Sequence, residues 1–382
     1  MSIDDGSLRE ELLVARAYLS AVAEPPAPAL VRFIGRHGVQ RAAELVRAGD
    51  VPDAVTEEVE ARREHVCGER ILGRARENGI RLLVPEQREW PHERFSCLSD
   101  ATEIGIAGMA EPIALWVRGP ASLRAVTEKS VATVGARAAS GYGETLAAEF
   151  GYGLCGAGFT VVSGAAYGID GAAHRGALAA GDSTVAYLAC GVDMDYPAGH
   201  SRLLRTIAER GLVVSEYVPG TSPRRHRFLV RNRLIAASGQ GAVVVEAGAR
   251  SGAGNTANTA DALGRPVMAV PGPVTSASSV GCHMMIRSGK AVLVTGPEEV
   301  IEVIGPMGTS PVDDGAGQPR RGDGLDRDAK QLHDALAGSD GASAEQLARD
   351  SGLPLRKVRS LLPALEMAGL AVLGENGWVR RA

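Results

Sequence analysis

The stretch from Val131 to His174 constrains the fold more than any other part of the chain. It begins with an apolar run, Val131–Val134, that stops at a glycine, as a buried parallel strand does. A turn of small residues and a helical pattern follow, and a second apolar run over 159–162 ends at Ser163-Gly164. Strand, turn, helix and strand form one βαβ unit, whose glycines let a ligand approach the backbone at the start of the helix.

The same strand pattern recurs along the chain. Apolar runs lie at 131–134, 159–162, 184–189, 212–217, 242–247, 266–270 and 291–294, with helical patterns between them. This alternation predicts one doubly wound, Rossmann-like α/β domain with a mainly parallel sheet. Ligands of such sheets bind outside the carboxyl ends of the strands, so the polar residues that follow these runs form the candidate site.

The turn after the first of these strands differs from that of a dinucleotide-binding enzyme. It reads Gly135-Ala136-Arg137-Ala138-Ala139-Ser140-Gly141, without the G-x-G-x-x-G spacing. Ser163-Gly164 also stands where an acidic residue would hold a ribose. An arginine in this turn is better suited to a phosphodiester, which it holds by charge and hydrogen bonds. An NAD enzyme stays an alternative.

Five arginines lie between residues 224 and 233, where the sequence reads RRHRFLVRNR. Arginines neutralise phosphates, and Phe228 can stack on a base, so this composition is typical of a site for single-stranded nucleic acid. The alternative is a solvated basic loop. The run follows the strand at 212–217 closely, at the edge of the sheet where ligands bind, and this position favours the binding site.

Three further groups have the composition of a site. Ser251-Gly252 lies between a strand and a helix and suits anion binding by backbone N–H groups, with a flexible turn as the alternative. Ser163, Asp170 and His174 have the composition of a hydrolytic triad, but no nucleophile elbow is present, so structural roles are expected. Without a Walker lysine or a Cys and His set at ligand spacing, we expect no ATP site, no metal and no cofactor.

The regions before and after the sheet predict smaller units. Residues 1–68 show helical patterns around a glycine-bounded turn, which predicts a helical domain of the helix-hairpin-helix or SAM-like kind, with an ordinary helix–helix turn as the alternative. Residues 69–304 hold the extended Rossmann-like domain. Residues 305–325 are rich in Gly, Pro and Asp, which predicts a disordered linker.

The C-terminal residues 326–382 predict a winged-helix-like domain. Three helical patterns are followed by two short strands that flank Gly374-Glu-Asn-Gly377, a hairpin signal. Such a domain binds either DNA or another protein. Its eight Lys and Arg against nine Asp and Glu from 322 to 382 do not mark it as DNA-binding.

The overall charge and the cysteines narrow the class of protein. A formal net charge of −4 means that any nucleic-acid site must be a local patch. Five cysteines are scattered without a C-x-x-C pair, as expected for free thiols in a reducing compartment. The acidic start lacks a signal-peptide core, and no apolar run approaches ~20 residues, so we expect a cytoplasmic protein without a membrane segment.

Taken in order, the motifs resemble the DprA family, also called Smf. The resemblance is carried by Val134-Gly135-Ala136-Arg137, Ser163-Gly164 with Gly168-Ile169-Asp170, Ala172-Ala173-His174-Arg175-Gly176, Gly191 with Tyr196-Pro197, Ser215-Glu216-Tyr217, Arg231-Asn232-Arg233, Val245-Glu246-Ala247 with Arg250-Ser251-Gly252, and Val270-Pro271-Gly272. These motifs span about 130 to 290. Upstream, Trp90-Pro91 and the segment 115–119 also fit.

The resemblance implies a DNA-processing protein of natural transformation that is not an enzyme. Family members bind single-stranded DNA in the Rossmann-like domain, protect incoming DNA, dimerise through that domain, and load RecA onto DNA coated by single-strand-binding protein. Matched motif by motif, it implies a DNA site made of Gly135, Arg137, Ser163, Gly164, Arg225, Phe228, Arg231, Asn232, Arg233, Ser251 and Gly252.

The chain departs from the family pattern at four positions. Ala136 replaces a serine, Tyr167 stands where many members have arginine, and Ala253-Gly254 replaces a Gly-Ser-Leu pattern. The changes remove hydrogen-bond donors and one cation, which predicts weaker affinity for DNA.

Two rival functions stay open beside a homodimeric recombination mediator that binds single-stranded DNA. The first is a nucleotide or nucleoside-phosphate hydrolase, for which Glu246 before a glycine-rich turn offers a carboxylate. The arginine run argues against it, because a mononucleotide site needs one or two cations rather than five. The second is an adaptor that binds proteins through its C-terminal unit.

Overall fold

A computed structural model describes residues 10–181, 183–305, 325–336, 341–374 and 376–381. The chain divides into two compact units, Met1–Ser310 and Pro311–Ala382. The predicted linker over 305–325 lies outside the described residues, except for its first and last positions.

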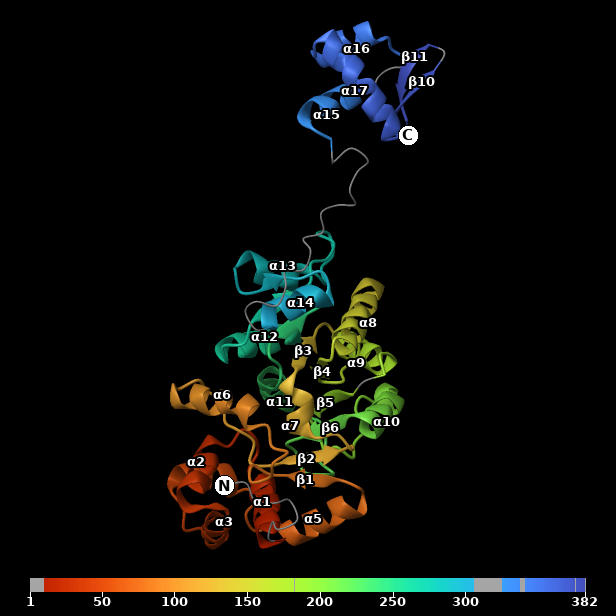
Figure 1. Cartoon of the computed structure of the whole chain (residues 1–382). Coiled ribbons are helices and arrows are strands. Elements are labelled where there is room, and N and C mark those ends of the chain that lie inside the picture. Colours follow the sequence, from red (N-terminus) through yellow and green to blue (C-terminus); the bar gives the residue numbers. More distant parts are fainter. Residues whose placement is uncertain (1–9, 182, 306–324, 337–340, 375, 382) are drawn as a thin grey trace. The chain divides into compact units, whose positions relative to one another are not determined.

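The larger unit is built on one nine-stranded sheet in the order β1-β2-β6-β5-β4-β3-β7-β8-β9 (Figure 1). The strands are β1 (Arg81–Leu83), β2 (Leu115–Arg118), β3 (Ser130–Val134), β4 (Thr160–Ser163), β5 (Thr184–Leu188), β6 (Leu212–Ser215), β7 (Ala242–Val244), β8 (Val267–Ala269) and β9 (Val292–Leu293). In this order, all neighbouring strands from β6 onward pair in parallel. β2 pairs antiparallel with both of its neighbours, β1 and β6. The predicted Rossmann-like, mainly parallel α/β fold is confirmed.

The order of the strands creates a switch point between β3 and β7. From β3, the chain builds outward on one side through β4, β5 and β6, and then returns to build β7, β8 and β9 on the other side. Thr133 of β3 pairs with Val243 of β7 in parallel register. The connections leave these two strands in opposite directions, so a crevice opens beyond their carboxyl ends.

Helices cover both faces of the sheet, which explains why the strands are apolar on both sides. In Figure 1, α8, α9 and α10 lie on one face, and α6, α11 and α12 lie on the other. The helices are α6 (His92–Glu103), α7 (Leu123–Glu128), α8 (Gly141–Gly156), α9 (Ile169–Ala179), α10 (Ser201–Arg210), α11 (Arg225–Ser238), α12 (Gly252–Ala262), α13 (Val280–Arg287) and α14 (Pro297–Ile304). Phe150 of α8 packs in one core cluster, and Leu234 of α11 packs in the other.

The N-terminal helices pack directly against the antiparallel end of the sheet. They are α1 (Glu10–Val22), α2 (Pro28–His37), α3 (Val39–Ala48), α4 (Asp53–Val59) and α5 (Gly68–Glu77). Ala17 of α1 shares a buried core cluster with Leu72 of α5 and Trp116 of β2. Residues 1–310 form one compact unit, within which the boundary at residue 68 stays a prediction.

The C-terminal unit consists of three helices and a two-stranded hairpin. Its elements are α15 (Arg327–Ala335), α16 (Ala344–Ser351), α17 (Leu355–Met367), β10 (Ala371–Gly374) and β11 (Gly377–Arg380). Ser343 caps α16, its Oγ accepting from the N–H of Gln346 at 3.2 Å. Leu332, Leu347 and Val358 meet in a small core. The winged-helix-like prediction is confirmed.

Candidate nucleic-acid interface

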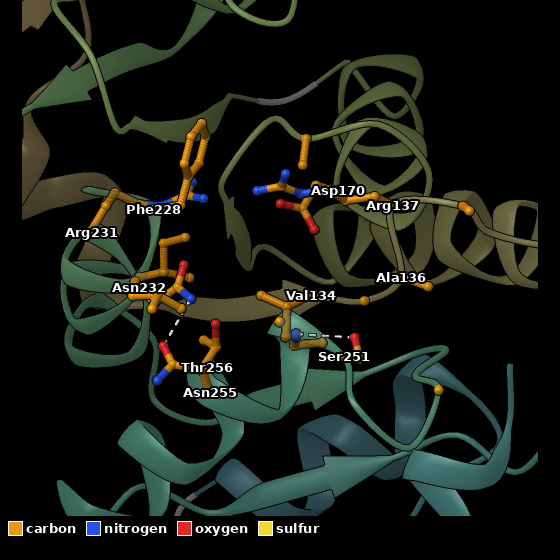
Figure 2. Close-up of a pocket in the computed structure, with 18 of the residues that line it drawn as sticks. Val134, Ala136, Arg137, Asp170, Phe228, Arg231, Asn232, Ser251, Asn255 and Thr256 are labelled. Atoms are coloured by element: carbon orange, nitrogen blue, oxygen red, sulfur yellow. Dashed lines mark hydrogen bonds between the residues drawn. The ribbon is translucent and has the colours of Figure 1, made fainter. Parts of the chain in front are cut away.

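A cavity of about 1110 Å³ opens at the switch point, beyond the carboxyl ends of β3 and β7 (Figure 2). Its walls come from the turn after β3, the first half of α11 and the start of α12. Eight of the eleven residues predicted for the DNA site line it: Gly135, Arg137, Arg225, Phe228, Arg231, Asn232, Ser251 and Gly252. Gly164 lines a small adjoining cavity beside Arg137 and Phe228, whereas Ser163 and Arg233 line neither of these two cavities.

The turn after β3 carries Arg137 to the cavity. A Cβ atom on Gly135 would meet a side-chain carbon of Ile169 at 2.4 Å, so the chain passes too close to α9 for any residue but glycine. Arg137 is exposed, and its Cζ lies 4.8 Å from the centre of the Phe228 ring. This cation–π contact joins the β3 turn to α11 across the cavity.

A second aromatic ring stands beside Phe228. Tyr196 also lines the cavity, and the centres of the two rings are 5.6 Å apart. Tyr196 is 40% exposed and Phe228 is half-buried, so together they offer an aromatic surface on which bases can stack. Tyr196 was not predicted as a site residue, although its place soon after the end of β5 was a usable signal.

The first arginines of the run have two different roles. Arg224 and Arg225 are exposed and line the cavity at the start of α11. Arg227 points away to Glu24 of the N-terminal part, its Nε donating at 2.7 Å, and it also stacks on the ring of Tyr217. Glu24 therefore fixes the start of α11 to the N-terminal helices.

Arg231 lies on the floor of the cavity and is almost entirely buried. Its Nη1 donates to the carbonyl oxygen of Tyr187 at 2.7 Å, whereas its Nε has no partner among the described residues. Burial lowers the pKa of Arg231 to about 10, and nearby Asp170 opposes that shift, so the guanidinium stays charged at neutral pH. A Cβ on Gly164 would lie 1.8 Å from Nη1, which is why a glycine stands beneath this arginine.

Arg233, which was predicted for the DNA site, is not among the residues that line the cavity. Its side chain is 2% exposed, and its Nη atoms donate to the two carboxylate oxygens of Glu216 at 2.7 and 2.8 Å. Its Nε donates to the carbonyl oxygen of Ala110 at 3.0 Å. Arg233 is thus fully engaged in a buried ion pair that holds α11 to the end of β6.

Ser163, Asp170 and His174 are all buried, and each is hydrogen-bonded to neighbouring groups. Ser163 is buried and donates to the carbonyl oxygen of Thr133 at 2.6 Å, while Nδ1 of His174 bonds to Thr184 at 2.8 Å. Burial lowers the pKa of His174 to about 3, so its ring is neutral. Burial raises the pKa of Asp170, which the charge of Arg231 opposes, and its carboxylate accepts from the N–H of Gly164 at 3.1 Å.

The start of α12 forms the remaining wall. Ser251 caps this helix, its Oγ accepting from the N–H of Ala253 at 3.2 Å. Asn232 of α11 donates to Asn255 of α12 at 3.0 Å, and Figure 2 shows this bond between the two helices. Arg250, immediately before the cap, is exposed and lines the cavity. Arg250 belongs to one of the motifs of the sequence but was not predicted as a site residue.

The four departures from the family pattern have distinct surroundings. Ala136 and Ala253 line the cavity without side-chain donors, and a Cβ on Gly254 would meet open space. Tyr167 lies in a small adjoining cavity with Gly164, and its hydroxyl accepts from the N–H of Gly199 at 3.2 Å. The cation expected there is therefore replaced by a ring engaged with its own neighbours.

Four exposed arginines surround the opening of the cavity, namely Arg137, Arg224, Arg225 and Arg250. Among the described residues none of them has a carboxylate partner, so their charges are available to phosphates. In the same part of the chain, no three His, Cys, Asp or Glu side chains gather as a metal site would require. Nor does any helix described in the structure have the length and apolar character needed to cross a membrane.

Comparison with known proteins identifies the family. A family model described as DNA recombination-mediator protein A matches residues 81–305, and one described as DprA winged helix domain matches residues 316–374. A putative DNA processing protein DprA of Mycobacterium tuberculosis is 46% identical over 367 residues, which cover 95% of this chain and 93% of that protein. Protein Smf of Escherichia coli is 36% identical over 272 residues, covering 70% of this chain and 72% of that protein.

Solved structures agree. The X-ray structure of DNA processing protein A (DprA) from Streptococcus pneumoniae has a TM-score of 0.61 and 28% identity, covering 79% of this chain and 98% of that chain. DNA processing protein A from Helicobacter pylori, solved to reveal its single-stranded DNA binding mode, shares the fold with a TM-score of 0.50 at 24% identity, covering 58% of this chain and 94% of that chain. By its matching domains and its relatives, this chain belongs to the DprA family of DNA-processing proteins.

Proposed function

We propose that this chain binds single-stranded DNA in the cavity at the switch point. The observation that carries the proposal is the meeting of four exposed arginines with the Phe228–Tyr196 ring pair around one opening. The arginines suit a phosphate backbone, and the rings suit unstacked bases. The Helicobacter pylori relative, whose single-stranded DNA binding mode has been described, supports the same ligand class.

The rings favour a single strand over a duplex. A base can lie on Phe228 only when its own face is open, and in a duplex that face is covered by the next base pair. Phosphate contacts carry no sequence information, so binding should be largely independent of base sequence.

Anisotropy of labelled single-stranded and duplex oligonucleotides at several salt concentrations tests this proposal. Removing Arg225 or Arg250 should weaken single-strand binding and reduce the slope of log K against log salt by roughly 0.7 for each phosphate that is no longer neutralised. Arg41→Ala, at an exposed arginine of α3 outside the cavity, is the control and should change neither quantity. Equal affinity for duplex and single strand would contradict the proposal.

The bound strand is the substrate for recombination. We propose that the protein protects incoming DNA and loads RecA onto strands coated by single-strand-binding protein during natural transformation, in the cytoplasm. The family model's description as a recombination mediator supports this role. Nuclease protection and the assembly of RecA on coated strands measure it, and an Arg225→Ala variant that loads RecA normally although it no longer binds DNA would refute the link to the cavity.

We propose that the protein forms a dimer through the edge of the sheet at β9. The edge strand β9 exposes Val292 and Leu293, which are 51% and 46% exposed, and nearby α13 exposes Met284 at 57%. An apolar edge of this kind needs a cover in a stable protein. Light scattering should show a dimer that Leu293→Glu converts to a monomer; an unchanged mass would place the interface elsewhere.

We further propose that the protein turns over no nucleotide. The carboxylate that the hydrolase alternative requires, Glu246, is 2% exposed and accepts hydrogen bonds on both oxygens. Hydrolysis of nucleoside phosphates by pure protein, abolished by Glu246→Gln, would favour the hydrolase.

Binding of DNA or of protein by the C-terminal unit stays a prediction; on α17, Lys357 and Arg359 pair with Asp328 and Glu345.

A further inference from the structure

The first helix after the switch point begins where nucleotide-binding sheets of this architecture hold a phosphate. In those sheets the phosphate lies at the N-terminus of the helix that follows the central strand, where free N–H groups and the helix dipole attract an anion. Here that helix is α8, which runs for 16 residues from Gly141 and follows β3 directly. Its first turn is capped by Ser140, whose Oγ accepts from the N–H of Gly143 at 3.1 Å.

A side chain of the protein already lies at this helix start. Glu246 follows β7, the strand on the other side of the switch point, and its Oε2 accepts from the N–H of Ser140 at 2.8 Å. Its Oε1 accepts from the hydroxyl of Ser140, also at 2.8 Å. A Cβ on Gly143 would come within 2.4 Å of Oε2, so the carboxylate lies directly against the first turn of α8.

The same carboxylate holds two walls of the DNA cavity. The hydroxyl of Ser278, a cavity-lining residue, donates to Oε1 at 2.6 Å. The backbone of Glu246 adds a bond, its carbonyl oxygen accepting from the N–H of Ala136 at 2.7 Å. Glu246 therefore forms hydrogen bonds to the β3 turn on both sides of Arg137, and it connects this turn to the loop that contains Ser278.

We propose that Glu246 is a built-in anion that fills the phosphate position of this fold, and that it determines which ligand the cavity accepts. A phosphate at the start of α8 would meet the carboxylate at contact distance and be repelled. Mononucleotides and dinucleotides are thereby rejected, and the phosphates of a strand are directed to the arginines around the cavity. Glu246 is also a positioning residue for the turn that carries Arg137.

The first readout of this inference is independent of DNA binding. In Glu246→Ala, the N–H and hydroxyl of Ser140 and the hydroxyl of Ser278 lose their acceptor, and a space of carboxylate size opens. We expect the full-length variant to melt at a lower temperature than the native chain. Formate or inorganic phosphate should raise its melting temperature in proportion to the logarithm of anion concentration, as a ligand of the folded state does, and leave the native chain unaffected.

The second readout is nucleotide binding. Calorimetry should find that Glu246→Ala binds ATP at least about tenfold more tightly than the native chain, the factor expected from removing a like charge at contact distance. Two matched controls keep the space filled: Glu246→Gln retains an amide of the same shape, and Ser278→Ala retains the carboxylate. Ser278→Ala should neither be rescued by formate nor gain affinity for ATP. Glu246→Gln loses the negative charge but keeps the space filled, so formate should not rescue it, and its gain in ATP affinity should be smaller than that of Glu246→Ala.

Two results would overturn the proposal. One is equal stabilisation of the native chain and of Glu246→Ala by anions; the other is tight ATP binding by the native chain. If Glu246→Ala is unfolded without added anion, refolding in formate supports the proposal and failure to refold refutes it. Failure of the native chain to bind single-stranded DNA would remove the proposed function, while the anion rescue would still stand or fall by itself.

Discussion

Replacing Arg233 by alanine should destabilise the larger unit without removing a DNA contact. The arginine is 2% exposed, and three of its nitrogens donate to buried acceptors, two of them on Glu216. Alanine leaves the carboxylate of Glu216 buried at 5% exposure without its cation. A buried charge without a partner is strongly destabilising, because it has lost its hydration and has no counter-charge. Replacing the whole ion pair by apolar residues costs much less.

The expected size follows from this burial. Breaking a buried pair costs about 3–5 kcal/mol, a large part of the roughly 5–15 kcal/mol that stabilises a typical domain. In urea unfolding of the full chain, the first transition should move down by about 1 M or more, given slopes on the order of 3 kcal/mol per M. Arg202→Ala, at an exposed arginine of α10, is the control and should change stability by less than about 0.5 kcal/mol.

A double variant separates the charge from the space it fills. Arg233→Met with Glu216→Leu removes both charges and keeps the volume, so it should recover most of the lost stability. Affinity for single-stranded DNA per folded molecule should stay near the native value in all variants. If Arg233→Ala unfolds at the native urea concentration but binds DNA more weakly, the guanidinium contacts DNA and the reasoning from burial is wrong.

Three further predictions follow from the site and its supports. Phe228→Ala should cost on the order of 1–3 kcal/mol of single-strand binding with an unchanged salt slope and melting temperature; a lower melting temperature with normal affinity per folded molecule would make the ring a core residue. Burial alone would raise the pKa of Glu24, but hydrogen bonds from Arg227, Arg62 and His226 lower this pKa from 4.5 to about 2. The stability that Glu24 contributes is therefore present above pH 4.5 and is lost as the pH falls toward 2. Acid unfolding of Glu24→Gln should therefore be flatter in that window than acid unfolding of the native chain. A chain that ends at residue 310 should fold and bind single-stranded DNA, because residues 1–310 form one compact unit; failure to fold would contradict that division.

The sheet was predictable because buried parallel strands leave a strong trace in the sequence. Runs such as Val131–Val134 are apolar on both faces and end at glycine, so their positions could be read without knowing their neighbours. The crevice was predictable for the same reason, since parallel strands end together at one edge. The packing of Ala17 against Leu72 and Trp116 could not be predicted in this way, because it joins segments that are far apart in sequence.

Within the site, the limit was the direction in which each charged side chain points. A helix turns by about 100° per residue, so arginines two positions apart face different surroundings. Arg231 reaches the cavity floor and Arg233 reaches Glu216, yet both belong to one basic run. The sequence of the run does not distinguish an arginine that has a buried carboxylate partner from one that has none. Arg250, in contrast, could have been predicted as a site residue from its position after β7.

The antiparallel end of the sheet has a consequence for synthesis. Val117 of β2 pairs with Val214 of β6, which lies 97 positions later in the chain. At a translation rate of roughly 5–20 residues per second, β2 leaves the ribosome about 5–20 s before its partner strand exists. During that interval β1 can pair with one edge of β2, but the other edge, where Trp116 and Val117 meet β6 in the finished sheet, has no partner. The nascent chain therefore offers an apolar strand with open hydrogen bonds, the kind of segment that chaperones bind, before the cavity has begun to form.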